Sequence, residues 1–215
     1  MINNTDLIRP MLSFDKDDFY FVQVLKRRKD NPDMEKDMSV IDNFYISSFE
    51  SYDRIVPQII KLCDHENARG YFRLNKRNYK LLAPHMVKRT VEIAFGNDCH
   101  ALKNVFDSVA GEHHSDPDKK WIVDIDWVDF DLSRTLVIPK ENGDLGIMSG
   151  DSRMSELMSL IQGLQLEAKR DPLMKILQTK NGLHVITRPF NLQFFKTKFP
   201  KVDVHKDNPS ILYIP

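Results

Sequence analysis

The stretch Trp121–Trp127 (WIVDIDW) combines the composition of a buried strand with two acidic residues. Its β-branched and aromatic residues predict an extended conformation. Residues two apart along a strand share a face, with about 6.6 Å between their Cα atoms. Asp124 and Asp126 should therefore point to the same side as Ile122. Val123, Ile125 and Trp127 should point to the other side.

Two carboxylates on one strand face repel each other and lose hydration, so a largely apolar strand is a costly place for them. A divalent cation offsets that cost, and hard oxygen ligands suit Mg²⁺ or Mn²⁺. Such a pair can hold one ion or bridge two, as in phosphoryl-transfer enzymes. The alternative is an edge strand whose polar face meets solvent. Asp129 and Asp131 continue the same parity, but we expect them to lie in a loop at the rim.

A second informative stretch is Lys180–Thr187 (KNGLHVIT). Gly182 permits a tight turn and leaves room for a ligand close to the backbone. His184 lies within a β-branched run, where its imidazole can donate to a phosphate oxygen. Lys180 at the turn can add a point charge to the same ligand. The alternative for His184 is a structural histidine whose ring nitrogens are satisfied by neighbours.

Predicted helices and strands alternate along the rest of the chain, which indicates a mixed α/β protein of the α+β class. The predicted strands are Phe19–Leu25 (or a short helix), Val40–Ser47, Gly70–Leu74, Met174–Thr179, Leu183–Pro189 and Ile211–Ile214. The predicted helices are Phe49–His65, Asn78–Phe95, Cys99–Val109, Ser152–Lys169 and Asn191–Lys198. The polar run Lys26–Asp33 predicts an exposed loop.

The turn-rich stretch His113–Lys120 (HHSDPDKK) is the best candidate boundary within the chain. It divides the 215 residues into an N-terminal module, 1–112, and a C-terminal module, 113–215. With 41% hydrophobic residues the chain can bury a substantial core. We expect the two modules to form one interlocked unit.

Composition narrows the possible functions. The 31 basic and 31 acidic residues give zero net charge, which argues against a binder with a uniformly basic surface. Two cysteines, Cys63 and Cys99, are too few for a disulfide framework and more typical of small apolar residues on helix faces. The sequence has neither a signal-peptide pattern nor an apolar run long enough for a membrane span. These features predict a cytoplasmic protein without a membrane partner.

Basic residues concentrate in the first half. Between Lys61 and Arg89 there are eight lysines and arginines but only two acidic residues. The stretch from Arg73 to Asn78 leaves a predicted strand and enters a predicted helix, a position from which side chains and backbone amides can converge on phosphate. We therefore predict that Arg73 and Arg77 bind a nucleotide. The alternative is a solvated helix face, which better describes Lys80, Lys88 and Arg89.

The motifs Val123-Asp124-Ile125-Asp126 and Lys180-Asn181-Gly182-Leu183-His184-Val185, in this order, resemble the archaeo-eukaryotic primase superfamily. The resemblance covers about the last hundred residues, through short motifs. The stretch Gly182-Leu183-His184-Val185 looks especially like the polymerase domains of bacterial repair ligases and small phage and plasmid primase-polymerases. The resemblance implies an N-terminal α/β module packed on a C-terminal RRM-like catalytic sheet. It also implies that Asp124 and Asp126 bind the catalytic metals and that His184 contacts the phosphates of the incoming nucleotide.

The superfamily carries a third metal-binding carboxylate, for which this chain offers two candidates. Asp203 follows an apolar residue, as the family pattern prefers, and it can complete the metal site if residues 202–204 form a strand beside the acidic one. Asp207 is the competitor. Both acids precede Asn208-Pro209, so the alternative for either is an ordinary turn residue.

The resulting prediction is a nucleotidyltransferase of primase-polymerase type. Asp124, Asp126 and Asp203 would bind Mg²⁺ or Mn²⁺, while His184, Lys180, Arg73 and Arg77 would bind the nucleotide. Its partners would be nucleoside triphosphates, a DNA or RNA template and primer, and replication proteins such as a helicase. Two alternatives remain open: an inactive nucleic-acid-binding accessory module, or another Asp-x-Asp metal enzyme such as a nuclease or a sugar transferase.

Overall fold

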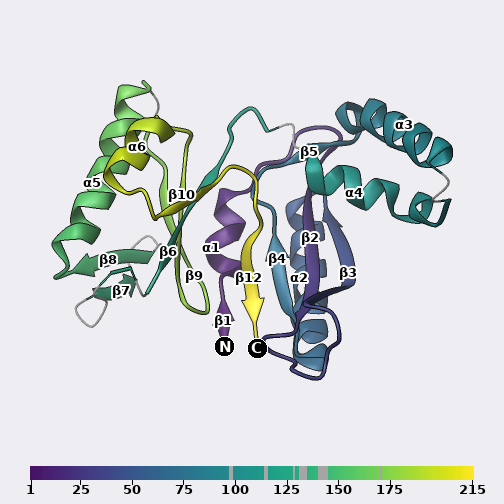
Figure 1. The fold of residues 1–215 in the computed structure, drawn as a ribbon, viewed down its shortest axis with the longest axis horizontal. Coiled ribbons are helices and arrows are strands. Elements are labelled where there is room, and N and C mark those ends of the chain that lie inside the picture. The colour runs from purple at the N-terminus through teal and green to yellow at the C-terminus, as the bar shows by residue number, and fades with distance from the viewer. Residues whose placement is uncertain (97–98, 114–115, 128, 131–134, 140–144, 170) are drawn as a thin grey trace.

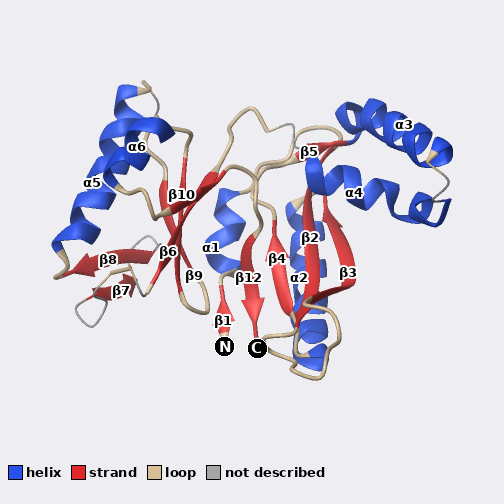
Figure 2. Cartoon of the chain, viewed as in Figure 1, coloured by secondary structure: helices blue, strands red, loops and turns tan. Residues whose placement is uncertain are grey.

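A computed structural model of the chain describes all residues except 97–98, 114–115, 128, 131–134, 140–144 and 170. The described residues build two main antiparallel sheets with helices packed on them (Figures 1 and 2). The predicted α+β class is confirmed. Asp131 of the predicted rim loop lies outside the described residues.

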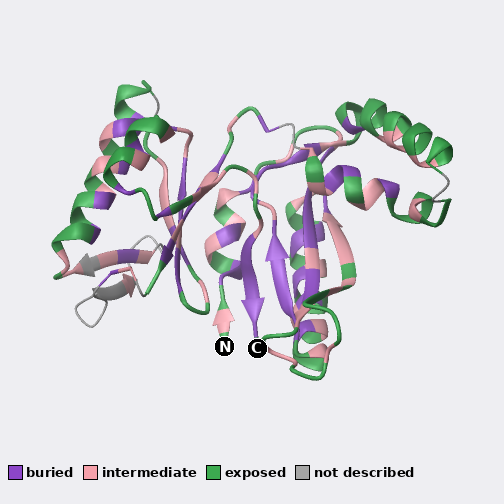
Figure 3. Cartoon of the chain, viewed as in Figure 1, coloured by how far each residue is buried: buried purple, intermediate pink, exposed green. Residues whose placement is uncertain are grey.

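The first sheet belongs mainly to the N-terminal half and has the strand order β1-β12-β4-β2-β3, with β5 also paired to β2. Its strands are β1 (Ile2–Asn3), β2 (Asp18–Arg27), β3 (Met38–Ile46), β4 (Arg69–Phe72), β5 (Arg77–Asn78) and β12 (Ser210–Ile214). The strands β12, β4 and β2 at its centre are mostly buried (Figure 3). This sheet is therefore the core of the first half.

Helix α2 (Phe49–Glu66) packs on one face of this sheet, together with α1 (Thr5–Ile8) and the 3₁₀ turn Arg9–Met11. A capping box at Ser48 starts α2, and Asn67 ends it in the left-handed conformation (φ 47°). The residues of α2 that reach the core recur at helical spacing and include Val56, Ile59 and Cys63.

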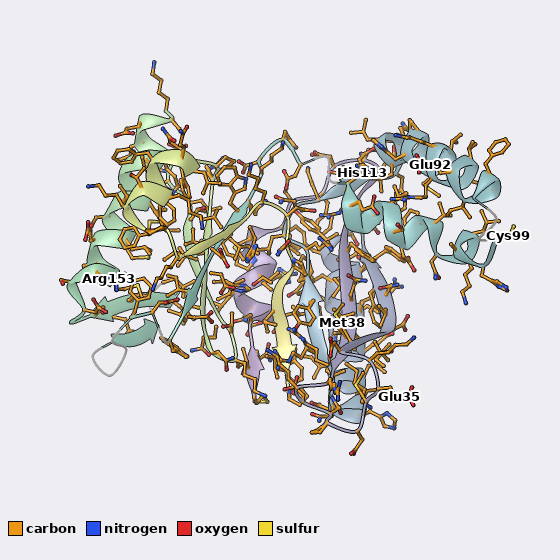
Figure 4. All side chains as sticks on the ribbon, in the orientation of Figure 1. Glu35, Met38, Glu92, Cys99, His113 and Arg153 are labelled. Atoms are coloured by element: carbon orange, nitrogen blue, oxygen red, sulfur yellow. The ribbon has the colours of Figure 1, made fainter. Side chains whose placement is uncertain are left out.

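The opposite face of the first sheet carries α3 (Tyr79–Phe95) and α4 (Val105–Glu112), which pack on Phe19 and Phe21 of β2. The predicted helix Cys99–Val109 is wrong at its start, because Cys99–Asn104 forms a 3₁₀ helix and α4 begins only at Val105. Cys99 lies exposed at the outer end of this helical lobe (Figure 4), so only Cys63 fills the apolar position expected of both cysteines.

The second sheet has the strand order β11-β6-β10-β9. Its strands are β6 (Trp121–Asp126), β9 (Met174–Gln178), β10 (Gly182–Thr187) and β11 (Asp203–His205). Helices α5 (Ser152–Glu167) and α6 (Leu192–Lys198) cover one face, where Val123 and Ile125 of β6 are buried. A hairpin of β7 (Thr135–Pro139) and β8 (Leu145–Ser149), absent from the sequence prediction, connects β6 to α5.

The other face of the second sheet meets the first half of the chain. Ile122, Leu177 and Ile186 from this face join the same hydrophobic cluster as α2 and the first sheet. The last strand, β12, returns to the first sheet between β1 and β4, which brings both termini side by side (Figure 1). The two halves thus share one core. Although β12 is the last strand of the chain, it belongs to the sheet of the first half, which precedes the boundary proposed at 113–120.

Within the described residues, no helix is both long and apolar enough to cross a lipid bilayer.

Candidate active site

The acidic strand β6 lies in the middle of the second sheet, between β10 and β11. Asp124 has His184 directly opposite on β10 and Asp203 directly opposite on β11, while Gly182 lies opposite Asp126. Directly paired residues of an antiparallel ladder point to the same face. The strand pairing therefore gathers three of the predicted site residues, Asp124, His184 and Asp203, into one row across the sheet.

His184 is held between two side chains. Its Nδ1 lies 2.8 Å from the Ser210 hydroxyl, and its Nε2 lies 3.5 Å from a carboxylate oxygen of Asp124. Burial, with a smaller effect from the charge of His205, lowers the pKa of His184 to about 4. The ring is therefore neutral at pH 7. When Ser210 donates to Nδ1, Nε2 carries the proton and can donate toward the acidic strand.

The two carboxylates of β6 are poorly compensated. Burial raises the pKa of Asp124 above its usual range; the negative charge of Asp203 adds to this, while His205 opposes it. The pKa of Asp126 is raised by burial and by the charges of Asp124 and Asp129. Burial thus disfavours the charged form of both carboxylates, and a bound cation would offset that cost. Such a pair of oxygen donors is suited to a cation.

The structure separates the two candidates for the third carboxylate. Asp203 lies on the edge strand beside Asp124, where its charge acts on that residue. Its side chain is 72% exposed and 3.5 Å from the ammonium of Lys196. Asp207 instead accepts hydrogen bonds from Asn75 and Arg77 in a partly buried cluster. Asp203 is thus the acid placed next to the acidic strand.

A pocket opens between this face and the first half of the chain. Acidic residues and His184 line one side, and basic residues from the first half and from the β9–β10 turn line the other. The lining residues are Arg27, Lys29, Arg69, Tyr71, Asp124, Asp126, Thr179, Lys180, Asn181, His184 and Ile211. The predicted residues Asp124, Asp126, His184 and Lys180 therefore share one pocket.

The basic side of the pocket is organised around Asp30. Arg69 donates two hydrogen bonds to its carboxylate, and Lys180 approaches it at 2.6 Å. These hydrogen bonds, that of Arg69 first, hold the pKa of Asp30 at about 2. The single carboxylate of Asp30 thus faces several positively charged side chains. Accordingly, burial and the neighbouring charges of Arg69 and Arg27 lower the pKa of Lys29.

Sequence reasoning missed Arg27, Lys29 and Arg69 as site residues. The predicted exposed loop Lys26–Asp33 is partly wrong, because β2 continues through Arg27. Lys29 faces the acids closely enough to lower the pKa of Asp126. The basic run Lys26-Arg27-Arg28-Lys29 was the available signal, but only the fold shows that it borders the acidic strand.

The prediction that Arg77 binds a nucleotide does not agree with its position. Its side chain is fully buried, and its guanidinium donates to the Ala110 carbonyl and to the Asp207 carboxylate. Arg73 donates to the backbone carbonyl of Asp207 and does not line the pocket. After β4, the segment that carries both arginines turns into the junction between the two halves, and Arg77 forms part of the short strand β5.

Gly182 is where β10 comes closest to the acidic strand. A Cβ atom on Gly182 would lie 1.9 Å from the carbonyl oxygen of Ile125 and 3.1 Å from the Cα of Asp126. Only glycine allows this approach. The sequence Gly-x-His thus places His184 in register with Asp124, because the strand pairs tightly from its first residue.

The donor chemistry of Asp124 and Asp126 fits a divalent cation, since both are oxygen donors short of compensating charge. Among the described residues, however, no three His, Cys, Asp or Glu side chains form a group that could hold a metal ion. Asp203 would have to turn from Lys196 toward Asp124 to complete a three-carboxylate site. Its high exposure leaves room for that rotation.

Another hollow lies over α5, β8 and β9, lined by residues such as Met154, Met158 and Ile176. It is larger than the pocket at the acidic strand, but none of the described residues lining it is charged. Of these two cavities, only the smaller pocket between the two halves has charged residues among the described residues that line it.

Comparison with known proteins found no matching family model, and no curated protein or solved structure matched the chain either. The assignment of a function therefore depends on the geometry of the pocket and on the motif resemblance.

Proposed function

We propose that this protein is a metal-dependent nucleotidyltransferase of primase-polymerase type, which transfers nucleotides from nucleoside triphosphates to a nucleic-acid 3′-hydroxyl. The observation that carries the proposal is the pocket in which Asp124, Asp126 and His184 face Lys29, Arg69 and Lys180. A nucleoside triphosphate with its metal needs such an arrangement, with oxygen donors for the cation and several basic groups for the phosphates.

The strand order adds support. The second half runs β6, α5, β9, β10, α6, β11, apart from the β7–β8 hairpin, and its sheet order is β11-β6-β10-β9. This is the order expected of an RRM-like βαββαβ unit, with both helices on one face. The site would then lie over the two central strands, on the face that these helices leave uncovered and that meets the first half of the chain.

The side chains of the basic wall would bind the triphosphate. Arg69 presents a planar guanidinium, whereas Lys29 and Lys180 act as point charges. Asp30, which neutralises part of this wall, would release N–H donors of Arg69 and Lys180 when phosphate oxygens arrive. Neutral His184 would donate from Nε2 to a phosphate oxygen, held in orientation by Ser210.

Asp124 and Asp126 would hold the divalent cation, with Asp203 as the third carboxylate. When bound, the cation would supply Lewis-acid activation of the 3′-hydroxyl and the α-phosphate. The chain itself aligns the reactants, because the acids and the basic wall belong to facing elements that share one core.

A primer-extension assay with a labelled DNA primer-template, all four deoxynucleoside or ribonucleoside triphosphates, and Mn²⁺ tests the proposal. We expect elongated products from the wild type. Asp124→Asn should reduce the rate at least about 1,000-fold, because the amide cannot replace a metal-binding carboxylate. Asp37→Asn, a change at a side chain that is 97% exposed, should retain the wild-type rate.

Equal product from the wild type and Asp124→Asn would contradict the proposal. Binding of primer-template without any product would favour the accessory-module alternative. Shortened primers, instead of elongated ones, would indicate a nuclease, and transfer from nucleotide sugars alone would indicate a sugar transferase.

A further inference from the structure

His205 is a second histidine beside the acidic strand that the sequence motifs did not single out. It lies on β11 two residues after Asp203, so both side chains point to the same face as Asp124. Its Nε2 lies 3.8 Å from a carboxylate oxygen of Asp124, on the side away from His184. Asp124 is thus flanked by an imidazole from each neighbouring strand.

The two histidines differ in how firmly their side chains are held. The side chain of His184 is 13% exposed and is fixed by its hydrogen bond to Ser210. The side chain of His205 is 32% exposed and lies on a three-residue edge strand. No hydrogen bond is assigned to the His205 ring among the described residues. A ring at this edge can adjust its position without disturbing the core.

The separation of the donors suits a shared ion. Nitrogen and oxygen ligands lie about 2.0–2.2 Å from a bound first-row divalent ion, so two ligands of one ion are at most about 4.4 Å apart. The 3.8 Å between His205 Nε2 and the Asp124 oxygen falls within that limit. Asp203, next but one on the same strand, can supply a further oxygen.

We infer that His205 is a nitrogen ligand of the divalent cation held by Asp124, an inference that rests on the proposed function. Mg²⁺ prefers oxygen ligands and retains water, whereas first-row transition metals accept an imidazole ligand, although Mn²⁺ binds it the most weakly of that series. The site should therefore take Mn²⁺ with an imidazole ligand, and His205 should contribute much less to the binding of Mg²⁺.

The test measures metal binding directly, without catalysis. Mn²⁺ is titrated into the full chain while free Mn²⁺ is followed by electron paramagnetic resonance, and Mg²⁺ affinity is obtained by competition. His205→Ala should weaken Mn²⁺ binding about tenfold or more and Mg²⁺ binding less than about threefold. His205→Asp should reduce the preference for Mn²⁺ over Mg²⁺, because it replaces a nitrogen ligand with an oxygen ligand.

Spin-echo measurements on bound Mn²⁺ should show coupling to an imidazole nitrogen that is lost in His205→Ala. His65→Ala, at a histidine that is 80% exposed on α2, is the matched control and should match the wild type. His205→Asn, which keeps a polar side chain, replaces His205→Ala if thermal melting shows that the alanine variant is not folded.

Equal Mn²⁺ affinity in the wild type and His205→Ala, or equal weakening of Mn²⁺ and Mg²⁺, would overturn the inference while leaving the proposed function intact. Nitrogen coupling that persists in His205→Ala would do the same. Absence of any Mn²⁺ binding by the wild type would overturn both the inference and the metal-dependent function.

Discussion

Asp124 occupies the centre of the candidate site, with its side chain 32% exposed and imidazoles near both carboxylate oxygens. His184 offers it no compensating charge, because its ring is neutral at pH 7. The carboxylate therefore carries a free-energy cost in the absence of a cation, which its raised pKa reflects. Residues that serve binding often cost stability in this way.

Replacing this carboxylate should stabilise the metal-free protein. Asp124→Asn removes the uncompensated charge and should raise the free energy of unfolding at pH 7 by about 0.5–1 kcal/mol, the size of effect typical of a partly exposed charge. Urea unfolding in the presence of a chelator measures the difference. Asp37→Asn, at a fully solvated side chain, should change nothing.

The effect should depend on pH in a defined direction. Because the pKa of Asp124 is raised on folding, the folded state holds its proton to higher pH than the unfolded state. This contribution to the free energy of unfolding is complete below the pKa of Asp124 in the unfolded state, which is near 3.8. It is lost as the pH rises through the higher pKa of Asp124 in the folded state. The advantage of Asp124→Asn should therefore vanish near pH 3. If Asp124→Asn were less stable than the wild type at pH 7, neighbouring groups would already compensate the negative charge of Asp124.

At the scale of elements, the pairing of β10 with β6 sets the site, and Gly182 is its closest point of approach. The sequence predicted both strands, because each is a short stretch rich in β-branched residues and bounded by turn residues. It also predicted α2 and α5, whose apolar positions recur at helical spacing. Both signals depend only on residues that are close together in the sequence.

Other elements escaped prediction because they depend on tertiary contacts. The two-residue strands β1 and β5 are too short to have a pattern of their own. The strand β2 extends into a basic run because β3 pairs with it as far as Arg27. No sequence period marks such an extension. The break in the predicted helix Cys99–Val109 likewise has no glycine or proline to announce it.

A methyl group at Gly182 should separate the two strands. Gly182→Ala should lower the free energy of unfolding by about 1–3 kcal/mol, because the new Cβ meets the Ile125 carbonyl at 1.9 Å and the backbone must move. It should also reduce primer extension, since His184 shifts with its strand. Thermal or urea unfolding and the extension assay measure both effects.

Gly163 provides the matched control for this substitution. It lies within α5, and a Cβ there would meet nothing within 4 Å. Gly163→Ala should therefore stabilise the protein by up to about 1 kcal/mol, since alanine favours the helix. If Gly182→Ala were as well tolerated as Gly163→Ala, the tight register of β10 on β6 would be refuted.

In the molecule as a whole, the candidate site lies at the junction of the two halves, and its basic wall and acidic strand come from distant parts of the chain. The sequence supplied the acids, His184 and Lys180, because these lie in two compact motifs. It could not supply Arg27, Lys29 and Arg69, whose convergence depends on how the sheets pack. The same limit explains why Arg77 was predicted to bind a nucleotide. A basic segment of sequence does not reveal which of its arginines is buried.

The junction is held by a buried ionic cluster. Arg77 bonds to Asp207, and Asn75 bonds to the backbone of Lys120 and Lys206, so the cluster ties the first half to both ends of the second. Removing one partner leaves the other charge buried without compensation. The role of Arg77 is therefore to join the two halves.

Arg77→Met should lower the free energy of unfolding by about 3–5 kcal/mol, as for other broken buried ion pairs. Arg28→Met is the matched control: Arg28 is paired to Asp37 at 3.9 Å on the surface and should change stability by less than about 1 kcal/mol. Urea unfolding measures both. An Arg77→Met protein of wild-type stability that no longer binds nucleotide would instead support the original prediction of a nucleotide-binding role.

The most direct test of the central claim is a crystal structure with Mn²⁺ and a non-hydrolysable nucleoside triphosphate. The account predicts an anomalous Mn²⁺ peak bound by Asp124 and Asp126, with the phosphates against Lys29, Arg69 and Lys180. A nucleotide bound elsewhere, such as in the hollow over α5 and β8, or a pocket that stays free of Mn²⁺ at saturating concentration, would contradict it.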